Sequence, residues 1–211
     1  MTVTVDRPQA PDRRLMRRGV RLEAATVGWN MVEAVIALTA GLTAGSVALT
    51  GFGLDSAIEI VAAVLVLIRL RSALSGQASD PTRERRALRA IAITFVALAS
   101  YLLADGIATL LTGTRPHDSP VGIGVTAAAL IVMPSLAMAK RRAGRALGNQ
   151  LLVSESAESA LCASLAGTTL VALAVYAATG AAWVDPVAGF VIAGYALREA
   201  REAWEGELCE G

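Results

Sequence analysis

Two pairs of side chains with metal-ligating chemistry lie inside apolar stretches of this sequence. Asp55 and Glu59 are four residues apart in one apolar run, and Glu158 and Cys162 have the same spacing in another. Residues four apart lie on one face of a helix, so two antiparallel helices would bring three carboxylates and a thiol to one point. Four such ligands suit a tetrahedral divalent ion, zinc above all.

The surroundings of these acids favour a visiting cation as their partner. A carboxylate buried in hydrocarbon is costly unless it is protonated, paired or bound to a cation. We expect no Lys, Arg or His deep enough in the apolar runs to pair with the acids. Counting about 1.5 Å per residue from the ends of the runs places all four ligands within a middle band about 10 Å tall, in a hydrocarbon core about 30 Å thick.

Other polar side chains in the apolar runs are expected to support the site or to replace one of its ligands. They are Asn30, Glu33, Asp105 and Glu155. Glu155 would replace Cys162 if the helix were turned slightly, whereas Glu33 and Asp105 also suit a proton path or a clasp between helices. Asp185 precedes a proline where a helix should begin, so we expect it to be the N-cap of that helix.

Each of these residues also has a purely structural interpretation. Asp55 and Glu59 would then form a protonated pair that caps neighbouring hydroxyl groups such as that of Ser56. Glu158 has a similar alternative, and Cys162 would be a small packing residue.

The stretches that carry these residues predict an all-α, polytopic membrane protein. The chain has 211 residues, of which 55% are hydrophobic but only 4% aromatic, and its mean hydropathy is +0.55. A membrane span needs about 20 apolar residues, and five of six apolar segments meet that length. The sixth must include the amphipathic sequence REAREAW or tilt. The segments are about 24–44, 48–68, 88–111, 121–139, 151–178 and 183–197.

Basic residues set the expected topology. All but Arg115 of the 19 Lys and Arg residues lie before the first segment, after the second, after the fourth or at the end of the sixth. The positive-inside rule therefore places both termini in the cytoplasm. We expect a disordered, basic cytosolic arm at residues 1–22, a transmembrane domain at 23–204 and a short cytosolic tail at 205–211.

Several classes of function are not expected. The polar, basic N-terminus is unlike a cleavable signal peptide. No P-loop or Gly-rich phosphate motif indicates ATP-driven transport. No nucleophile–base pair indicates an enzyme and no motif indicates an organic cofactor. The net charge of +1 gives no reason to expect a nucleic-acid partner.

Three stretches of the sequence resemble the cation diffusion facilitators, a family of six-span antiporters that exchange divalent metal ions for protons. The resemblance covers about residues 13–204. The first stretch is GWNMVEAVIALTAGLTAGSVALTGFGLDSAIE, the second is the fifth segment, and the third is WVDPVAGFVIAGYALREAREAW. In the first stretch the matching residues are Asn30, Gly41, Ser46, Ala48, Leu49, Asp55 and Ser56.

The candidate ligands depart from the pattern of that family. Glu59 stands where aspartate is more usual, Glu158 where histidine is common, and Cys162 where aspartate is common. A thiolate favours zinc or cadmium, whereas a site richer in oxygen would allow iron, manganese or cobalt.

The resemblance implies a secondary transporter that exports a divalent metal ion, with zinc favoured, from the cytoplasm against inward protons. It implies a multi-pass protein of the plasma (inner) membrane, embedded in lipid. The sequence does not contain the cytosolic C-terminal domain typical of the family, so a homodimer would form through the transmembrane helices. The alternatives are a membrane scaffold or partner subunit without transport activity, and a proton- or cation-conducting channel.

Overall fold

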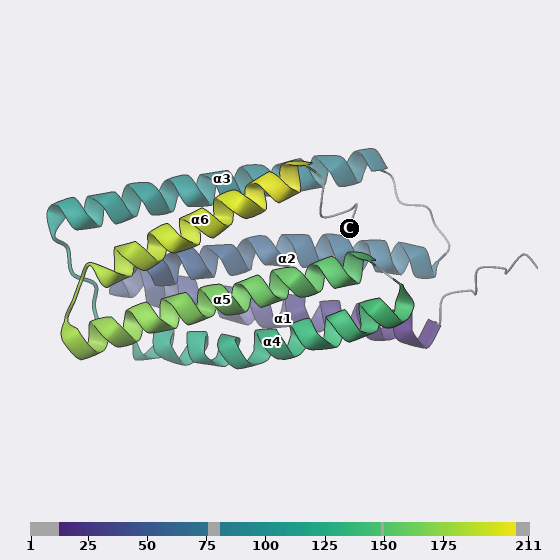
Figure 1. Cartoon of the computed structure of the whole chain (residues 1–211), viewed down its shortest axis with the longest axis horizontal. Coiled ribbons are helices and arrows are strands. Elements are labelled where there is room, and N and C mark those ends of the chain that lie inside the picture. The colour runs from purple at the N-terminus through teal and green to yellow at the C-terminus, as the bar shows by residue number, and fades with distance from the viewer. Residues whose placement is uncertain (1–12, 76–80, 149, 206–211) are drawn as a thin grey trace, which may run out of the picture.

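The computed structural model describes residues 13–75, 81–148 and 150–205, and within these ranges the chain consists of six α-helices joined by short turns. The prediction of an all-helical fold with six helices is confirmed for these residues (Figure 1). The helices are α1 (Arg13–Ala44), α2 (Val47–Leu74), α3 (Pro81–Thr112), α4 (Pro120–Leu147), α5 (Gln150–Thr179) and α6 (Val184–Glu205).

The lengths of the helices suit a membrane. Helices α1 to α5 are long and apolar enough to cross one. Helix α6 has 22 residues, about 33 Å at 1.5 Å per residue, which matches a hydrocarbon core of roughly 30 Å. As expected, α6 reaches this length only by including its charged C-terminal stretch.

The first helix begins earlier than the sequence pattern suggested. Helix α1 starts at Arg13, so the expectation of a disordered arm is wrong for residues 13–22, and residues 1–12 lie outside the described residues. Arg, Leu and Met are good helix formers, and Met16 and Gly19 are buried against the bundle. Helix α3 likewise starts before its apolar run, at Pro81, because proline is well suited to the first helical position. Residues 206–211 of the expected tail also lie outside the described residues.

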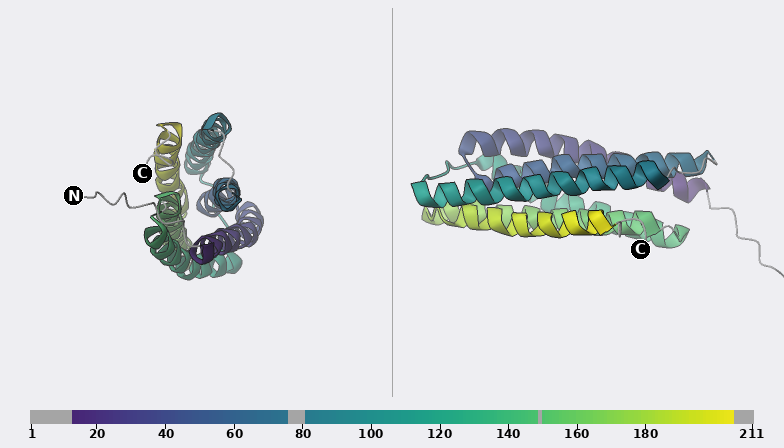
Figure 2. Two further views of the ribbon diagram at one scale, coloured as in Figure 1. Left: turned by 90° about the vertical axis from the view of Figure 1, so that its right-hand side faces the viewer. Right: turned by 90° about the horizontal axis from the view of Figure 1, so that it is seen from above.

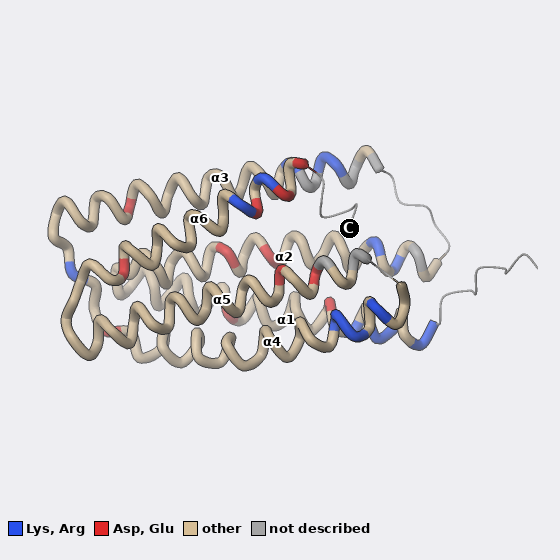
Figure 3. Tube along the Cα trace, viewed as in Figure 1, with Lys and Arg blue, Asp and Glu red and all other residues tan. Residues whose placement is uncertain are grey.

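The two ends of the bundle differ in charge. Successive helices alternate in direction, so the connections at residues 45–46, 113–119 and 180–183 lie at one end, here called the hairpin end. Lys and Arg gather at the opposite end, here called the basic end (Figure 3). The view along the bundle shows α3 and α6 as a pair beside the other four helices (Figure 2).

Helix α2 lies in the middle and contacts α1, α3, α5 and α6. Glycines allow two of these contacts to be very close. A Cβ atom at Gly53 would lie 2.8 Å from the backbone nitrogen of Leu38 on α1, and one at Gly189 of α6 would lie 2.7 Å from Cγ1 of Val47. The position of α2, which carries two of the predicted ligands, is therefore fixed from two sides.

Asp185 binds the first turn of α2 and is not the N-cap of its own helix, as the sequence suggested. It lies in the first turn of α6 and is 1% exposed. Its Oδ1 accepts a hydrogen bond from Ser46 Oγ at 2.5 Å, and its Oδ2 accepts one from Val47 N at 2.7 Å. A carboxylate at a helix N-terminus satisfies free N–H groups and is favoured by the helix dipole. Asp185 therefore clasps α6 to α2 at the hairpin end.

Replacement of Asp185 by alanine should lower the free energy of unfolding by about 1–3 kcal/mol, because the buried donors at the start of α2, on Ser46 and Val47, would lose their acceptor. Thermal unfolding in detergent micelles measures this loss. The matched control is Asp118→Ala, since Asp118 is an exposed acid at the same end and its loss should change stability by less than about 0.5 kcal/mol. Equal melting temperatures for the two variants would show that the clasp contributes nothing to stability.

Candidate metal site between helices α2 and α5

Three of the four predicted ligands converge. One ligand atom each from Asp55, Glu59 and Cys162 lie within 4.8 Å of one another. Asp55 is 5% exposed and Cys162 is 1% exposed, while Glu59 is half-buried. The i, i+4 spacing on α2 places both carboxylates on the side of the helix that faces α5. The spacing within the two sequence pairs predicted that the α2 carboxylates and the Cys162 thiol would lie close together, as they do here.

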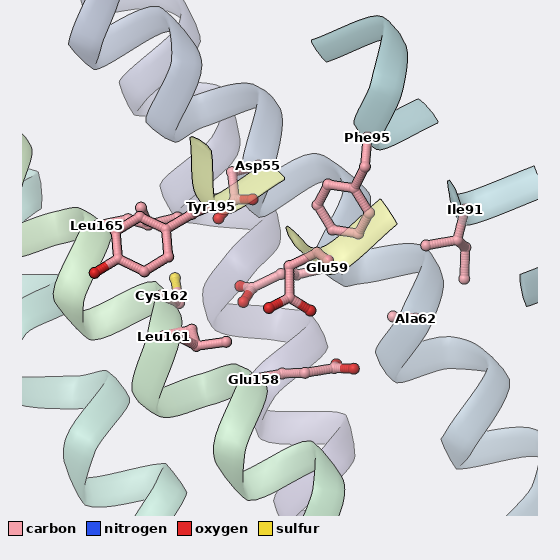
Figure 4. Close-up of a pocket in the computed structure, with 11 residues that line it drawn as sticks. Asp55, Glu59, Ala62, Ile91, Phe95, Glu158, Leu161, Cys162, Leu165 and Tyr195 are labelled. Atoms are coloured by element: carbon pink, nitrogen blue, oxygen red, sulfur yellow. The ribbon is translucent and has the colours of Figure 1, made fainter. Parts of the chain in front are cut away.

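A small cavity lies among these side chains. Figure 4 shows Asp55 and Glu59 of α2 and Cys162 of α5 projecting into the space between the helices. The cavity has a volume of about 30 Å³, which suits one water-sized particle. Its other lining residues are Ala62, Ile91, Phe95, Glu158, Leu161, Leu165, Tyr195 and Glu199. The cavity therefore has the size for a single ion stripped of most of its water.

Glu158, the fourth predicted ligand, lies beside the group and not within it. It lines the same cavity from α5, one turn nearer the basic end than Cys162. Its oxygens do not belong to the set of ligand atoms that lie within 4.8 Å of one another. The sequence spacing predicted that Glu158 lies on the same face of α5 as Cys162. It did not predict the rotation of α5 about its axis, which sets the distance from the Glu158 carboxylate to the other candidate ligands.

Two residues of helix α1 form hydrogen bonds with the candidate ligands or with a residue next to them. Asn30 Nδ2 donates a hydrogen bond to Glu59 Oε2 at 2.9 Å. Glu33 accepts hydrogen bonds from Ser56 Oγ at 2.7 Å, from the Cys162 thiol at 3.7 Å and from Trp29 Nε1. Asn30 and Glu33 are both fully buried. Asn30 and Glu33 thus contact the candidate ligands directly, and their role in supporting a metal site stays a prediction.

Glu155 has a fixed basic partner, so the expectation that no basic side chain reaches these acids is wrong for this residue. Lys140 of α4 is fully buried. Its Nζ lies 3.2 Å from Glu155 Oε2 and 3.1 Å from Glu23 Oε2, and it donates to Ser159 Oγ at 3.2 Å. The structure therefore pairs Glu155 with Lys140 and does not place it among the candidate ligands.

The error over Lys140 has a simple physical origin. The sequence pattern assigned it to a basic linker after the fourth apolar run, but α4 continues to Leu147. Lys140 continues a buried stripe of α4 that includes Ala129, Met133 and Ala137, at spacings of three and four residues. It consequently points inward between α1 and α5.

Asp105 lies apart from the site. It is half-buried on α3, accepts a hydrogen bond from Tyr101 Oη at 3.3 Å and is not among the residues that line the cavity. Its position is about two turns from the hairpin end of its helix. The structure gives no support for it as a ligand.

Glu199 is a cavity residue that the sequence interpretation missed. It lines the cavity from α6, and its buried Oε1 has no hydrogen-bond partner among the described residues. Glu199 lies in the charged stretch REAREAW, which the sequence interpretation took to be in contact with water. The signal was present in the helical spacing, because Ile192, Ala196 and Ala203 are buried and Glu199 continues their face.

The lining of the cavity is strongly acidic. It contains four carboxyl groups and one thiol, and none of the lining residues found in the described part of the chain is Lys, Arg or His. Groups of this kind in a low-dielectric site are balanced by protons or by a bound cation.

Comparison with models of protein families gives a match. A family model for the cation efflux transmembrane domain matches residues 88–205, more than half of the chain. The matched region runs from α3 to the end of α6, so it includes Glu158, Cys162 and Glu199 but not the two candidate ligands on α2. A search of curated proteins gives no match.

Proposed function

Because the chain belongs to the family of cation efflux transmembrane domains, and is therefore a metal cation efflux transporter, we propose that it exports zinc in exchange for protons through the cavity between α2 and α5. The observation that carries this proposal is the convergence of Asp55, Glu59 and Cys162 within 4.8 Å in a cavity without a basic lining residue. A divalent cation would supply the positive charge that balances the acidic lining of this cavity.

The donor set supports a borderline-soft ion. Asp55 and Glu59 supply oxygen, Cys162 supplies sulfur, and Glu158 stands next to them on α5. Thiolate ligands favour zinc over magnesium or calcium, and carboxylates complete tetrahedral zinc sites. The proposed order of preference is therefore zinc or cadmium first, with oxygen-preferring transition metals behind them.

Proton exchange follows from the same ligands. Carboxyl and thiol groups coordinate a metal only when they are deprotonated, so metal binding releases protons and protons displace metal. No separate coupling device is needed if both cargoes use one set of side chains. Movement of helices about this fixed site would then expose it to each side of the membrane in turn.

The packing around the cavity supports access from the basic end. On the hairpin side of Asp55, helix α2 carries Leu49 and Phe52, both fully buried in the core. On the other side, the cavity lining continues along α2 to Ala62 and along α5 to Glu158. Under the positive-inside rule the basic end is cytoplasmic, so this arrangement corresponds to a site that faces the cytoplasm.

The outer surface suits lipid. Large apolar side chains that are more than half exposed include Val35, Leu42, Ile68, Ile93, Leu111, Ile131 and Val171. We place the protein in the plasma (inner) membrane with both termini in the cytoplasm, and we propose that part of this surface joins a second copy in a homodimer.

Metal uptake by acid-inside proteoliposomes tests the exchange. We expect saturable zinc uptake that increases with the pH gradient, because one proton exchanged across one pH unit supplies about 1.4 kcal/mol, a factor of about ten in accumulated metal. A fluorescent zinc reporter inside the vesicles measures it. The control is the same preparation after an ionophore has collapsed the gradient.

The outcomes separate the alternatives. A membrane scaffold gives no uptake above that of protein-free vesicles. A channel gives zinc current that persists after the gradient has collapsed. Either result is incompatible with the proposed exchange.

A further inference from the structure

Helix α6 forms a third wall of the cavity and places an acid there. Tyr195 and Glu199, one turn apart, both line it. The Oε1 atom of Glu199 is buried and has no hydrogen-bond partner among the described residues. A carboxylate oxygen shielded from water without a hydrogen-bond partner is unfavourable, and a cation received by the cavity would satisfy it.

The other acids at this end of α6 differ from Glu199. Glu202 accepts a hydrogen bond from Arg198 Nε at 2.7 Å, and Glu205 accepts one from Arg201 Nε at 2.8 Å. Both pairs have the i, i+4 spacing on exposed or half-exposed positions. Glu199 instead turns toward the cavity, where Asp55 and Glu158 are among its acidic neighbours.

Within the described part of the chain, Asn30 of α1 also has a buried oxygen without a hydrogen-bond partner, although Asn30 is not among the residues that line the cavity. Asn30 is fully buried, and its Nδ2 donates to Glu59. Its Oδ1 has no hydrogen-bond partner among the described residues. Asn30 therefore supports Glu59 from outside the lining of the cavity.

The backbone of α6 is held firmly enough to make this placement specific. Asp185 clasps it to α2, and a Cβ atom at Gly106 of α3 would lie 2.5 Å from Phe190. Nearer the basic end, the Arg89 guanidinium lies over the Trp204 ring, 5.6 Å from its centroid. Glu199 lies between these contacts along the helix, so its approach to the cavity is set by packing.

We infer that Glu199 is a further binding residue for the transported cation. Its oxygens, like those of Glu158, lie outside the set of ligand atoms within 4.8 Å of one another, so a side-chain movement would bring an oxygen ligand from α6 to the ion held by Asp55, Glu59 and Cys162. This inference rests on the proposed function. The ion would then join α2, α5 and α6 at the level of the cavity, while the Asp185 clasp joins α2 and α6 at the hairpin end. Occupancy of the site would thereby fix the position of the α3–α6 pair relative to α2.

The test compares Glu199→Gln with Glu202→Gln in the full chain. Both changes remove one carboxylate from α6, but Glu202 is paired with Arg198 outside the cavity. We expect Glu199→Gln to raise the zinc dissociation constant and the KM for uptake at least about tenfold, as loss of a direct or orienting metal contact does. It should also change the visible absorption spectrum of bound Co²⁺, which reports the ligands directly. Glu202→Gln should match the unaltered protein in all three measurements.

Two results would overturn the inference. In one, Glu199→Gln binds zinc with unaltered affinity and spectrum. In the other, affinity falls but the Co²⁺ spectrum stays the same, which would make Glu199 a positioning residue and not a ligand. If Glu199→Gln does not fold, Glu199→Asp serves instead, because it keeps the charge but withdraws the oxygen by one methylene and should also alter the spectrum.

Asp55→Asn in the same assays separates this inference from the proposed function. Loss of binding in Asp55→Asn together with an unaltered Glu199→Gln protein rejects only the role of Glu199. Unaltered zinc binding in Asp55→Asn rejects the site on which the proposed function depends.

Discussion

Replacement of Asp55 by asparagine should abolish metal transport and leave the fold intact. The change removes one oxygen ligand and one negative charge from the centre of the site, where Asp55 is 5% exposed and faces Glu59 and Cys162. Loss of a group that only orients a metal ligand already costs about 10–100-fold in affinity or activity, so loss of a ligand itself should cost about 100-fold or more. Zinc flux into proteoliposomes at equal protein content measures the effect.

Asp105→Asn is the matched control for this variant. Asp105 is also an acid within a membrane-spanning helix, but it bonds to Tyr101 outside the cavity. Its replacement should leave flux within a factor of about two. Equal flux in the Asp55 and Asp105 variants would mean that the cavity does not carry the metal.

Replacement of Lys140 by methionine should lower the free energy of unfolding by about 3–5 kcal/mol, because removal of one partner leaves buried charge uncompensated. Glu23 and Glu155 both lie within 3.2 Å of the ammonium group and are themselves buried. Chemical unfolding in detergent measures the loss. The adjacent exposed residue provides the control, since Arg141→Met should shift stability by less than about 0.5 kcal/mol.

A compensating variant makes the reason for this loss testable. Glutamine at both positions 23 and 155 removes the buried negative charges, so the triple variant Lys140→Met, Glu23→Gln, Glu155→Gln should recover most of the stability. Replacement of a whole buried ion network by neutral groups is often close to neutral. If the triple variant is as unstable as Lys140→Met alone, the lysine stabilises the bundle by packing and not by charge.

Much of the fold was predictable because the bilayer restricts the choice of structure. Apolar runs of about 20 residues can satisfy their backbone in lipid only as helices, so the number and type of the elements followed directly. Their ends did not follow, since Arg13 and Pro81 begin helices well before the apolar residues do. Basic residues at the membrane surface can belong to a helix as readily as to a loop, so they do not mark where a helix ends.

The candidate site was predictable in part. The spacing of Asp55 and Glu59, and the similar depths counted along α2 and α5, correctly predicted that α2 acids and Cys162 would meet. Lys140 and Glu199 were missed because both lie in charged stretches near helix ends, where sequence alone suggests contact with water. Whether such a residue turns inward depends on the rotation of its helix against its neighbours, as the buried faces of α4 and α6 demonstrate.

X-ray anomalous scattering from zinc-soaked crystals tests the central claim most directly, because it reports the element and its ligands together. We predict a single strong zinc peak within bonding distance of Asp55, Glu59 and Cys162, in the space between α2 and α5. A peak confined to other parts of the molecule, or crystals in which this cavity stays free of zinc at saturating concentration, would contradict the claim.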